Sequence, residues 1–192
     1  MGDLLWNIDT KEKELYLTFD DGPTPVITEW VLQTLNEYKA KATFFCLGKN
    51  VDEEQNTYEL IQKEGHAVGN HTQNHVDGWK TDNSLYFKNI EECSERVKSK
   101  LFRPPYGKIS LSQSKVLKQK YKIVMWDVLS ADFDLSITPE KCARNVLDNA
   151  SKGSIIVMHD SVKAEKNLRY ALPKILAQFT KEGFQFKALP MT

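Results

Sequence analysis

The chain has 192 residues, of which 41% are hydrophobic and 27% charged, a composition that is normal for a globular protein with a substantial core. Lysine plus arginine and aspartate plus glutamate balance at 26 each, and no block of basic residues stands out, so a nucleic-acid-binding surface is not expected. No segment approaches the ~20 consecutive apolar residues that a membrane span requires.

The N-terminal stretch MGDLLWNIDTKEKE turns charged too early to be a secretory signal. We therefore expect either a cytoplasmic protein or a domain of an exported one, and the compartment and oligomeric state stay open. The cysteines Cys46, Cys93 and Cys142 are odd in number and widely spaced in apolar or helical patterns. They are expected to be small buried hydrophobic residues, without a disulfide framework.

Strand-like and helix-like apolar patterns alternate along the chain. The predicted strands are residues 15–19, 42–48, 66–71, 121–128, 154–160 and 184–189. The predicted helices run through residues 25–35, 58–64, 85–101, 116–117, 138–150 and 168–179. Thr24 and Pro25 are expected to begin the first helix, Thr138 to cap the fifth, and Pro173 to kink or restart the last. This alternation predicts a parallel α/β sheet or barrel, and the absence of repeats or linkers predicts one domain over residues 1–192.

Ionisable residues lie at or just after the ends of several predicted strands, at the carboxyl ends where α/β proteins bind ligands. These residues are Asp20, Asp21, His71, Asp127, Asp132 and His159. Strand-end loops often carry polar residues, so position alone raises the odds of a functional site only modestly.

The stretch HTQNH places His71 and His75 four residues apart, close enough for both imidazoles to reach one cation. Two polar residues on a surface loop are the alternative. Thr72 follows His71, so the zinc-protease pattern, with its internal glutamate, is absent, and the loop also lacks the His-x-Asp/Glu pair of non-haem iron sites. Asp21 can complete a three-ligand site, with Asp20 beside it as a proton acceptor; otherwise the two aspartates cap a helix or solvate a turn.

Five motifs together resemble those of the polysaccharide deacetylase family with the NodB homology domain (carbohydrate esterase family 4). In the family's order they are TFDDGP, HTQNH, RPPYG, WDVLSADF and IIVMH, and they span residues 18–159. The resemblance implies a deformed (β/α) barrel with fewer than eight parallel strands. It also implies a metal-dependent hydrolase that removes an acetyl group from a carbohydrate.

The resemblance assigns the first three motifs to the metal and the base. Asp20 would be the general base, and Arg103 would hold and orient its carboxylate. The ligands of a divalent metal, zinc or alternatively Co²⁺, Ni²⁺ or Mn²⁺, would be Asp21, His71 and His75. Tyr106 would offer its backbone N–H to the developing oxyanion, while its side chain could simply pack against the groove.

The last two motifs supply the acid. His159 would protonate the leaving amine, supported by Asp132. The family's fourth motif reads Asp-x-x-Asp-Trp, whereas this chain has Leu129 and Phe133 at the first and last of these positions, so the wall of the substrate groove is expected to differ. Trp79 is expected either to stack on a sugar or to pack in the interior.

These roles predict removal of N-acetyl groups from N-acetylglucosamine-containing carbohydrate such as peptidoglycan or chitin-like oligomers. The alternatives are an O-acetyl esterase of the acetyl-xylan type, a non-catalytic carbohydrate-binding domain, and a small-amide hydrolase related to allantoinase. Asp160 has no assigned role beyond a helix cap or loop contact.

Overall fold

Strand β2 (Glu14–Asp20) is the longest strand of a curled parallel sheet in the computed structural model, which describes residues 4–190. The strands are β1 (Leu4–Leu5), β2 (Glu14–Asp20), β3 (Thr43–Cys46), β4 (Ala67–Asn70), β5 (Leu101–Phe102), β6 (Lys122–Val124), β7 (Val128–Leu129), β8 (Ile155–His159) and β9 (Gln185–Phe186). Each named pair is parallel, and β2 pairs with β3 on one side and β8 on the other.

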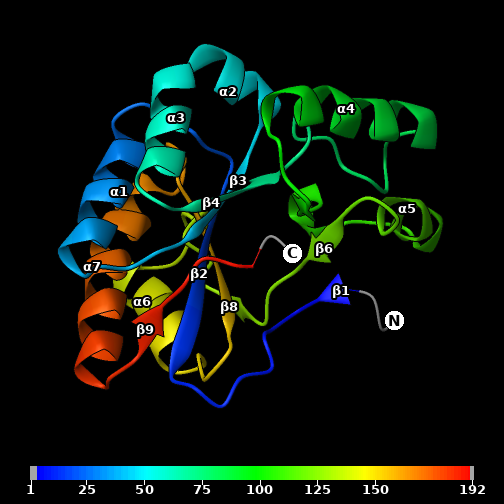
Figure 1. The fold of residues 1–192 in the computed structure, drawn as a ribbon. Coiled ribbons are helices and arrows are strands. Elements are labelled where there is room, and N and C mark those ends of the chain that lie inside the picture. The colour runs from blue at the N-terminus through cyan, green and yellow to red at the C-terminus, as the bar shows by residue number, and fades with distance from the viewer. Residues whose placement is uncertain (1–3, 191–192) are drawn as a thin grey trace.

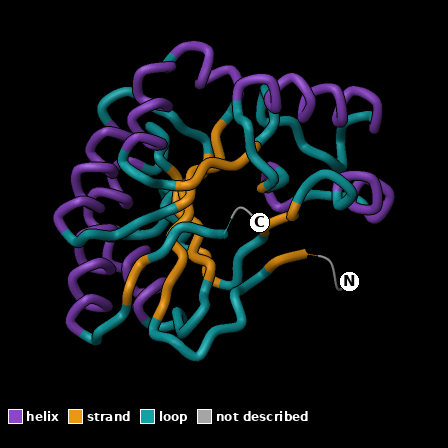
Figure 2. The backbone as a smooth tube through the Cα atoms, viewed as in Figure 1, coloured by secondary structure: helices purple, strands orange, loops and turns teal. Residues whose placement is uncertain are grey.

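Within residues 4–190, the order β1-β6-β5-β4-β3-β2-β8-β7 contains eight strands, and β9 pairs with the start of β2. The expectation of fewer than eight strands is therefore wrong. The strands β1, β5, β7 and β9 have two residues each, too few to show any periodicity in the sequence. The sheet is curled, and because its end strands β1 and β7 do not pair with each other within residues 4–190, it stays open as a half-barrel (Figure 2).

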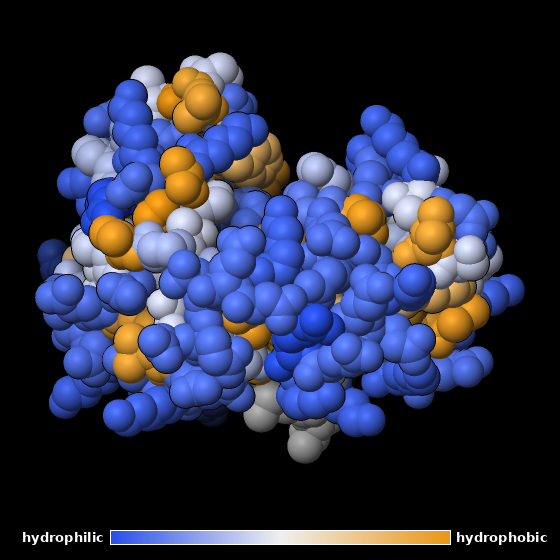
Figure 3. All heavy atoms as spheres, turned by 90° about the horizontal axis from the view of Figure 1, so that it is seen from above, coloured by the Kyte–Doolittle hydropathy of each residue, from blue (hydrophilic) through white to orange (hydrophobic). Residues whose placement is uncertain are grey.

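Helices surround the outer face of the curled sheet, with α1 and α7 on one flank and α4 and α5 on the other (Figure 1). The helices are α1 (Ile27–Glu37), α2 (Gly48–Glu53), α3 (Gln55–Lys63), α4 (Asn83–Arg96), α5 (Leu111–Leu117), α6 (Pro139–Leu147) and α7 (Glu165–Lys181), with a 3₁₀ turn at Pro105–Gly107. Among the described residues, no helix has both the length and the apolar character to cross a membrane. The face in Figure 3 is mostly hydrophilic, with hydrophobic residues in small separate groups.

The core has two sides because side chains alternate across β2. Leu17 and Phe19 join the large cluster between the sheet and its outer helices. Tyr16 packs with Phe45 in the interior of the half-barrel. By the same alternation, Asp20 shares the interior face with Tyr16, so the strand carries its last side chain into the hollow of the sheet.

Several predicted boundaries need correction. Helix α1 begins at Ile27 after Val26, which has a φ of 66°, and the Thr24 N–H donates to the Thr28 hydroxyl, so Thr24 and Pro25 form a turn before the helix. Helix α4 ends at Arg96, and Leu101 belongs to β5. Helix α7 continues through Pro173 without restarting.

Other predictions are confirmed. Thr138 caps α6, since its hydroxyl accepts a hydrogen bond from the Lys141 N–H at 3.2 Å. Cys46, Cys93 and Cys142 are free and buried, as expected of small hydrophobic residues. The sequence did not predict α2, because GKNVDE contains a single apolar residue and shows no helical periodicity.

Candidate active site

Strand register brings distant motifs together at the carboxyl edge of the sheet. Asp20 at the end of β2 pairs directly with His159 at the end of β8. On the other side, Asn70 of β4 pairs with Phe102 of β5, so the next residues, His71 and Arg103, are neighbours as well. Four strand ends therefore face one hollow, as the alternation of elements predicts.

The Asp20 carboxylate is buried and held by Arg103, which is itself fully buried. Arg103 donates to Asp20 Oδ1 at 2.7 Å and to the Thr18 hydroxyl at 2.7 Å. It also donates to the carbonyl of Met125 at 2.8 Å, and its guanidinium lies 4.2 Å from the centre of the Phe45 ring. These contacts fix one oxygen of Asp20 and leave Oδ2 on the side of His71, at 3.9 Å from its Nε2.

The ionised form of Asp20 is favoured at this position. Burial by itself raises the pKa of Asp20, but the positive charge of Arg103, with a further contribution from His159, outweighs burial and holds the pKa below its usual value. A carboxylate that is ionised and tied through one oxygen can accept a proton through the other.

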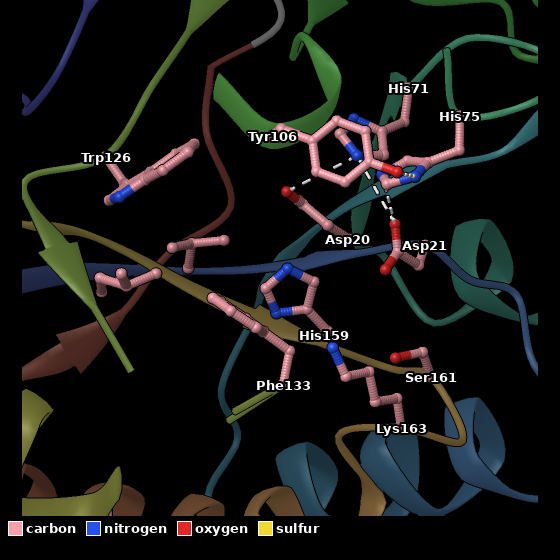
Figure 4. A pocket seen from close by; sticks show the side chains of 12 residues that line it. Asp20, Asp21, His71, His75, Tyr106, Trp126, Phe133, His159, Ser161 and Lys163 are labelled. Carbon is pink, nitrogen blue, oxygen red and sulfur yellow. Dashed lines mark hydrogen bonds and ion pairs between the residues drawn. The ribbon is translucent and has the colours of Figure 1, made fainter. Parts of the chain in front are cut away.

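Asp21, His71 and His75 form one compact group, and their ligand atoms all lie within 4.8 Å of one another (Figure 4). Asp21 Oδ1 lies 3.2 Å from His75 Nε2 and 3.7 Å from His71 Nε2. Asp21 and His75 have positive φ angles of 81° and 58°, a backbone conformation that is uncommon in residues other than glycine.

The Asp21, His71 and His75 side chains fit a divalent cation, and each residue provides one observation in support. Asp21 Oδ1 is buried and has no hydrogen-bond partner among the described residues. His71 Nδ1 lies 2.8 Å from the carbonyl of Arg103, and since a carbonyl only accepts, Nδ1 carries the proton and Nε2 offers its lone pair to the group. Burial and the neighbouring His71 lower the pKa of His75 to about 4, which leaves the neutral imidazole that binds metal. One carboxylate and two imidazoles are typical ligands of catalytic zinc.

His159 lies across the hollow from this group and is held by Asp132, which is fully buried. His159 Nδ1 lies 2.8 Å from Asp132 Oδ1, and the His159 backbone N–H donates to Asp132 Oδ2 at 2.7 Å. Burial disfavours the charged ring, but the negative charge of Asp132 outweighs it and raises the pKa of His159 to about 9. The imidazolium, which can donate a proton, is therefore the favoured form near neutral pH.

One cavity of about 470 Å³ contains both halves of the site. It is lined by Asp20, Asp21, His71, His75, Tyr106, Trp126, Leu129, Phe133, Val157, His159, Ser161 and Lys163. The two departures from the family's fourth motif, Leu129 and Phe133, both line it, as expected for an altered groove wall. Phe133 packs edge-on against His159, with ring centres 5.1 Å apart (Figure 4).

Tyr106 stands at the metal side of the cavity. Its ring centre is 4.5 Å from that of His75, and its hydroxyl lies 3.1 Å from His75 Nδ1. The side chain is 60% exposed, so it packs along the groove without closing it.

Asp127 and Trp79, which the sequence also singled out, do not line this cavity. Asp127 accepts hydrogen bonds from the Ile155 N–H and the Ser154 hydroxyl at the start of β8, the opposite end of that strand from His159. Trp79 is 67% exposed, so the expectation that it packs in the interior is wrong.

Two buried polar residues hold the motifs in place: sequence reasoning did not identify Asn70, whereas the loop contact expected of Asp160 is confirmed. Asp160 accepts from the Gly22 N–H at 3.1 Å and from the Thr28 hydroxyl. Asn70 donates to the Ile90 carbonyl and accepts from the Thr72 N–H, which fixes the start of the His71 loop. Each is a buried polar residue next to a motif residue, and that adjacency is the signal that could have identified them.

Carboxylate and imidazole ligands at the strand ends of an α/β half-barrel, facing an acid and a base, make the kind of site that metal-dependent hydrolases use. The family model described as "Polysaccharide deacetylase" matches residues 7–122, more than half of the chain. A peptidoglycan-N-acetylglucosamine deacetylase of Bacillus cereus is 34% identical over 192 residues, which cover 96% of this chain and 90% of the relative. A chitooligosaccharide deacetylase of Azorhizobium caulinodans is 31% identical over 206 residues, which cover 95% of this chain and 96% of the relative.

A solved structure agrees with these relatives. The crystal structure of a peptidoglycan N-acetylglucosamine deacetylase in complex with a substituted N-oxidanyl-benzamide matches with a TM-score of 0.92 at 33% identity, over 98% of this chain and 91% of that chain. The chain belongs to the polysaccharide deacetylase family.

Proposed function

We propose that this protein is a metal-dependent hydrolase that removes N-acetyl groups from N-acetylglucosamine units of peptidoglycan or chitin-like oligomers. The observation that carries the proposal is the arrangement of three groups around one cavity: the Asp21, His71 and His75 ligand set, the Asp20 carboxylate, and the His159 ring. The names of the two relatives describe deacetylases of such glycans, which supports the same substrate class for this chain. The protein is a carbohydrate deacetylase.

Asp21, His71 and His75 would hold the metal, for which zinc is our proposal and Co²⁺, Ni²⁺ and Mn²⁺ are the alternatives. A divalent ion held by such ligands supplies Lewis acidity, which polarises a carbonyl and acidifies water. The argument for a cation is that Asp21 Oδ1 lacks a hydrogen-bond partner within residues 4–190 while two imidazole nitrogens face it.

Asp20 and His159 each carry out one of the two proton transfers. Asp20 accepts the proton of the attacking water through Oδ2, because Oδ1 is tied to Arg103. The Tyr106 N–H donates to the oxygen on which negative charge develops. His159 gives its proton to the departing nitrogen, and Asp132 keeps the ring oriented and charged for this step. The C–N bond breaks, and acetate and a free amine leave.

We further propose that residues 1–192 act as one catalytic domain, because the site draws on segments from Asp20 to His159. An O-acetyl esterase of the acetyl-xylan type is the second candidate, since Leu129 and Phe133 alter the cavity wall where the substrate would lie. The same ligand set and proton-transfer groups serve an ester as well as an amide.

An acetate-release assay tests the proposal on N-acetylglucosamine oligomers, peptidoglycan and acetyl-xylan, each before and after chelation. We expect acetate and new amines from the first two substrates and loss of both products after chelation. Release from acetyl-xylan alone would favour the esterase. Binding of the oligomers without any acetate release would favour a non-catalytic carbohydrate-binding domain and contradict the proposal.

A further inference from the structure

Trp79 is a large aromatic side chain that the fold leaves in solvent, with 67% of it exposed. It lies on the segment of residues 76–82, here called the Trp79 loop, between His75 and helix α4. Exposed aromatic groups beside a binding cavity often mark a surface that a ligand covers. The question is whether the Trp79 loop is built to hold the indole in place.

Asp77 closes the Trp79 loop into a tight turn. Its carbonyl accepts from the N–H groups of Lys80 and Thr81 at 3.1 and 3.0 Å. Its side chain accepts from the Trp79 N–H at 2.9 Å through Oδ1 and from Lys108 Nζ at 2.9 Å through Oδ2. The backbone that carries the indole is therefore fixed by hydrogen bonds on both sides.

The Trp79 loop is also anchored from below. Gln113, which is 1% exposed, donates to the Gly78 carbonyl at 2.7 Å. A Cβ atom at Gly78 would lie 2.5 Å from the Lys108 carbonyl oxygen, so the loop packs directly on the segment that follows Tyr106. The backbone of such an anchored loop needs little further ordering when a ligand binds, which lowers the entropic cost of binding.

A row of groups connects this loop to the metal ligands. The Tyr106 ring packs on His75 with ring centres 4.5 Å apart. Lys108 Nζ lies 5.4 Å from the centre of the Tyr106 ring and 5.7 Å from that of Trp79, within the range of cation–π contacts. Two exposed aromatic side chains with an ammonium between them thus extend from the site across the surface; we call Tyr106, Lys108 and Trp79 the aromatic platform.

We propose that the aromatic platform binds sugar units of the glycan chain that lie two or more positions beyond the N-acetylglucosamine unit whose acetyl group is hydrolysed, because Trp79 is separated from His75 by both Tyr106 and Lys108. The apolar C–H face of a pyranose ring suits an exposed indole, and the Lys108 ammonium has N–H donors for sugar hydroxyls in addition to the one on Asp77. Because Asp77 neutralises Lys108, the platform suits an uncharged ligand such as a neutral glycan. The inference rests on the proposed function, and it makes the protein selective for longer oligomers.

The test compares a long and a short substrate. kcat/KM for acetate release is measured on chitohexaose and on chitobiose for the wild type, Trp79→Ala, Trp79→Phe and Val116→Ala. Val116 is the control, an exposed apolar residue in a separate groove between α4 and α5. We expect Trp79→Ala to lower the hexamer value about tenfold, the equivalent of about 1.4 kcal/mol, and to leave the dimer value unchanged. Trp79→Phe should retain most of the hexamer activity, and Val116→Ala all of it.

An equal fall in kcat/KM on both substrates, or no fall on either, would contradict the proposal, because only the longer chain is expected to reach the aromatic platform. A wild type that hydrolyses neither oligomer would instead contradict the proposed function. In that case, titration calorimetry of chitohexaose tests the aromatic platform. Weaker binding by Trp79→Ala than by the wild type supports the proposal, and equal binding contradicts it.

Discussion

The two oxygens of the Asp20 carboxylate have different partners, and this division allows a buried acid to act as a base. Oδ1 accepts from Arg103 at 2.7 Å, whereas Oδ2 faces His71 and the metal-ligand group. Asp21, next in the chain, turns away through a φ of 81° to join the two histidines. Two adjacent like charges are tolerated because Arg103 compensates one, and a cation would compensate the other.

Asp20→Asn should remove the proton acceptor while leaving the metal ligands in place. Since general base catalysis typically contributes about 10²–10⁴-fold, we expect acetate release to fall by about that factor. Metal content, measured by elemental analysis after gel filtration, should match the wild type. Turnover at the wild-type rate would show that Asp20 is not the base.

The pH dependence of activity should report on His159. The ring donates its proton only when charged, and its pKa is raised to about 9, so acetate release should fall as the pH rises through about 9. Asp132→Asn removes the charge that raises this pKa, so the alkaline limb should move to lower pH. Asp127→Asn is the matched control, because Asp127 lies at the opposite end of β8. If the alkaline limb of the pH profile were unchanged in Asp132→Asn, Asp132 would not be the residue that keeps His159 charged.

At the scale of elements, the turn between β2 and α1 is held by the residue that follows β8. Asp160 accepts from the Gly22 N–H and from the Thr28 hydroxyl of α1, and its own N–H donates to the Asp20 carbonyl at 3.2 Å. A methyl group at Gly22 would overlap the Asp160 carboxylate. Glycine is therefore required here by close approach between two loops.

A double-mutant cycle tests this close approach. Gly22→Ala should lower the free energy of unfolding by about 1–3 kcal/mol, as overpacking of a filled site usually does. In an Asp160→Ala background, Gly22→Ala should lower the free energy of unfolding by clearly less, because the carboxylate that the new methyl group would overlap is absent. Urea unfolding of the four proteins gives the coupling. Additive effects would show that the two residues do not conflict.

The long elements could be predicted because each contains enough residues for a pattern. Strands β2 and β8 are apolar runs, and α6 combines a capping threonine, a proline at its first position and helical spacing. The two-residue strands have no period of their own and exist only because longer neighbours pair with them. Helix α4 was predicted too long because Val97 and Leu101 continue its spacing, although Leu101 pairs in the sheet.

For the whole molecule, the candidate site and its place at the carboxyl ends of the strands were predictable from the motif residues, whereas the strand register that aligns them was not. The sequence contains Asp20, His71 and His159 as separate signals, and only strand register brings their side chains to one cavity. The roles of Asp160 and Asn70 could not be read from their adjacency to motif residues alone, because a polar residue in a loop or at a strand end becomes informative only once its burial and partners are known.

Binding of a metal should stabilise the whole fold, because its ligands come from segments that are far apart in the sequence and meet only in the native state. At a free Zn²⁺ concentration about a hundredfold above Kd, mass action adds about 2.7 kcal/mol to the free energy of unfolding. For a domain of this size, that corresponds to a rise in Tm of about 5–10 °C. Differential scanning calorimetry with Zn²⁺ and then with a chelator measures the rise and its reversal. Asp21→Ala is the comparison variant, since it removes the ligand whose Oδ1 lacks a partner. An equal rise in that variant, or none in the wild type, would contradict a site built from Asp21, His71 and His75.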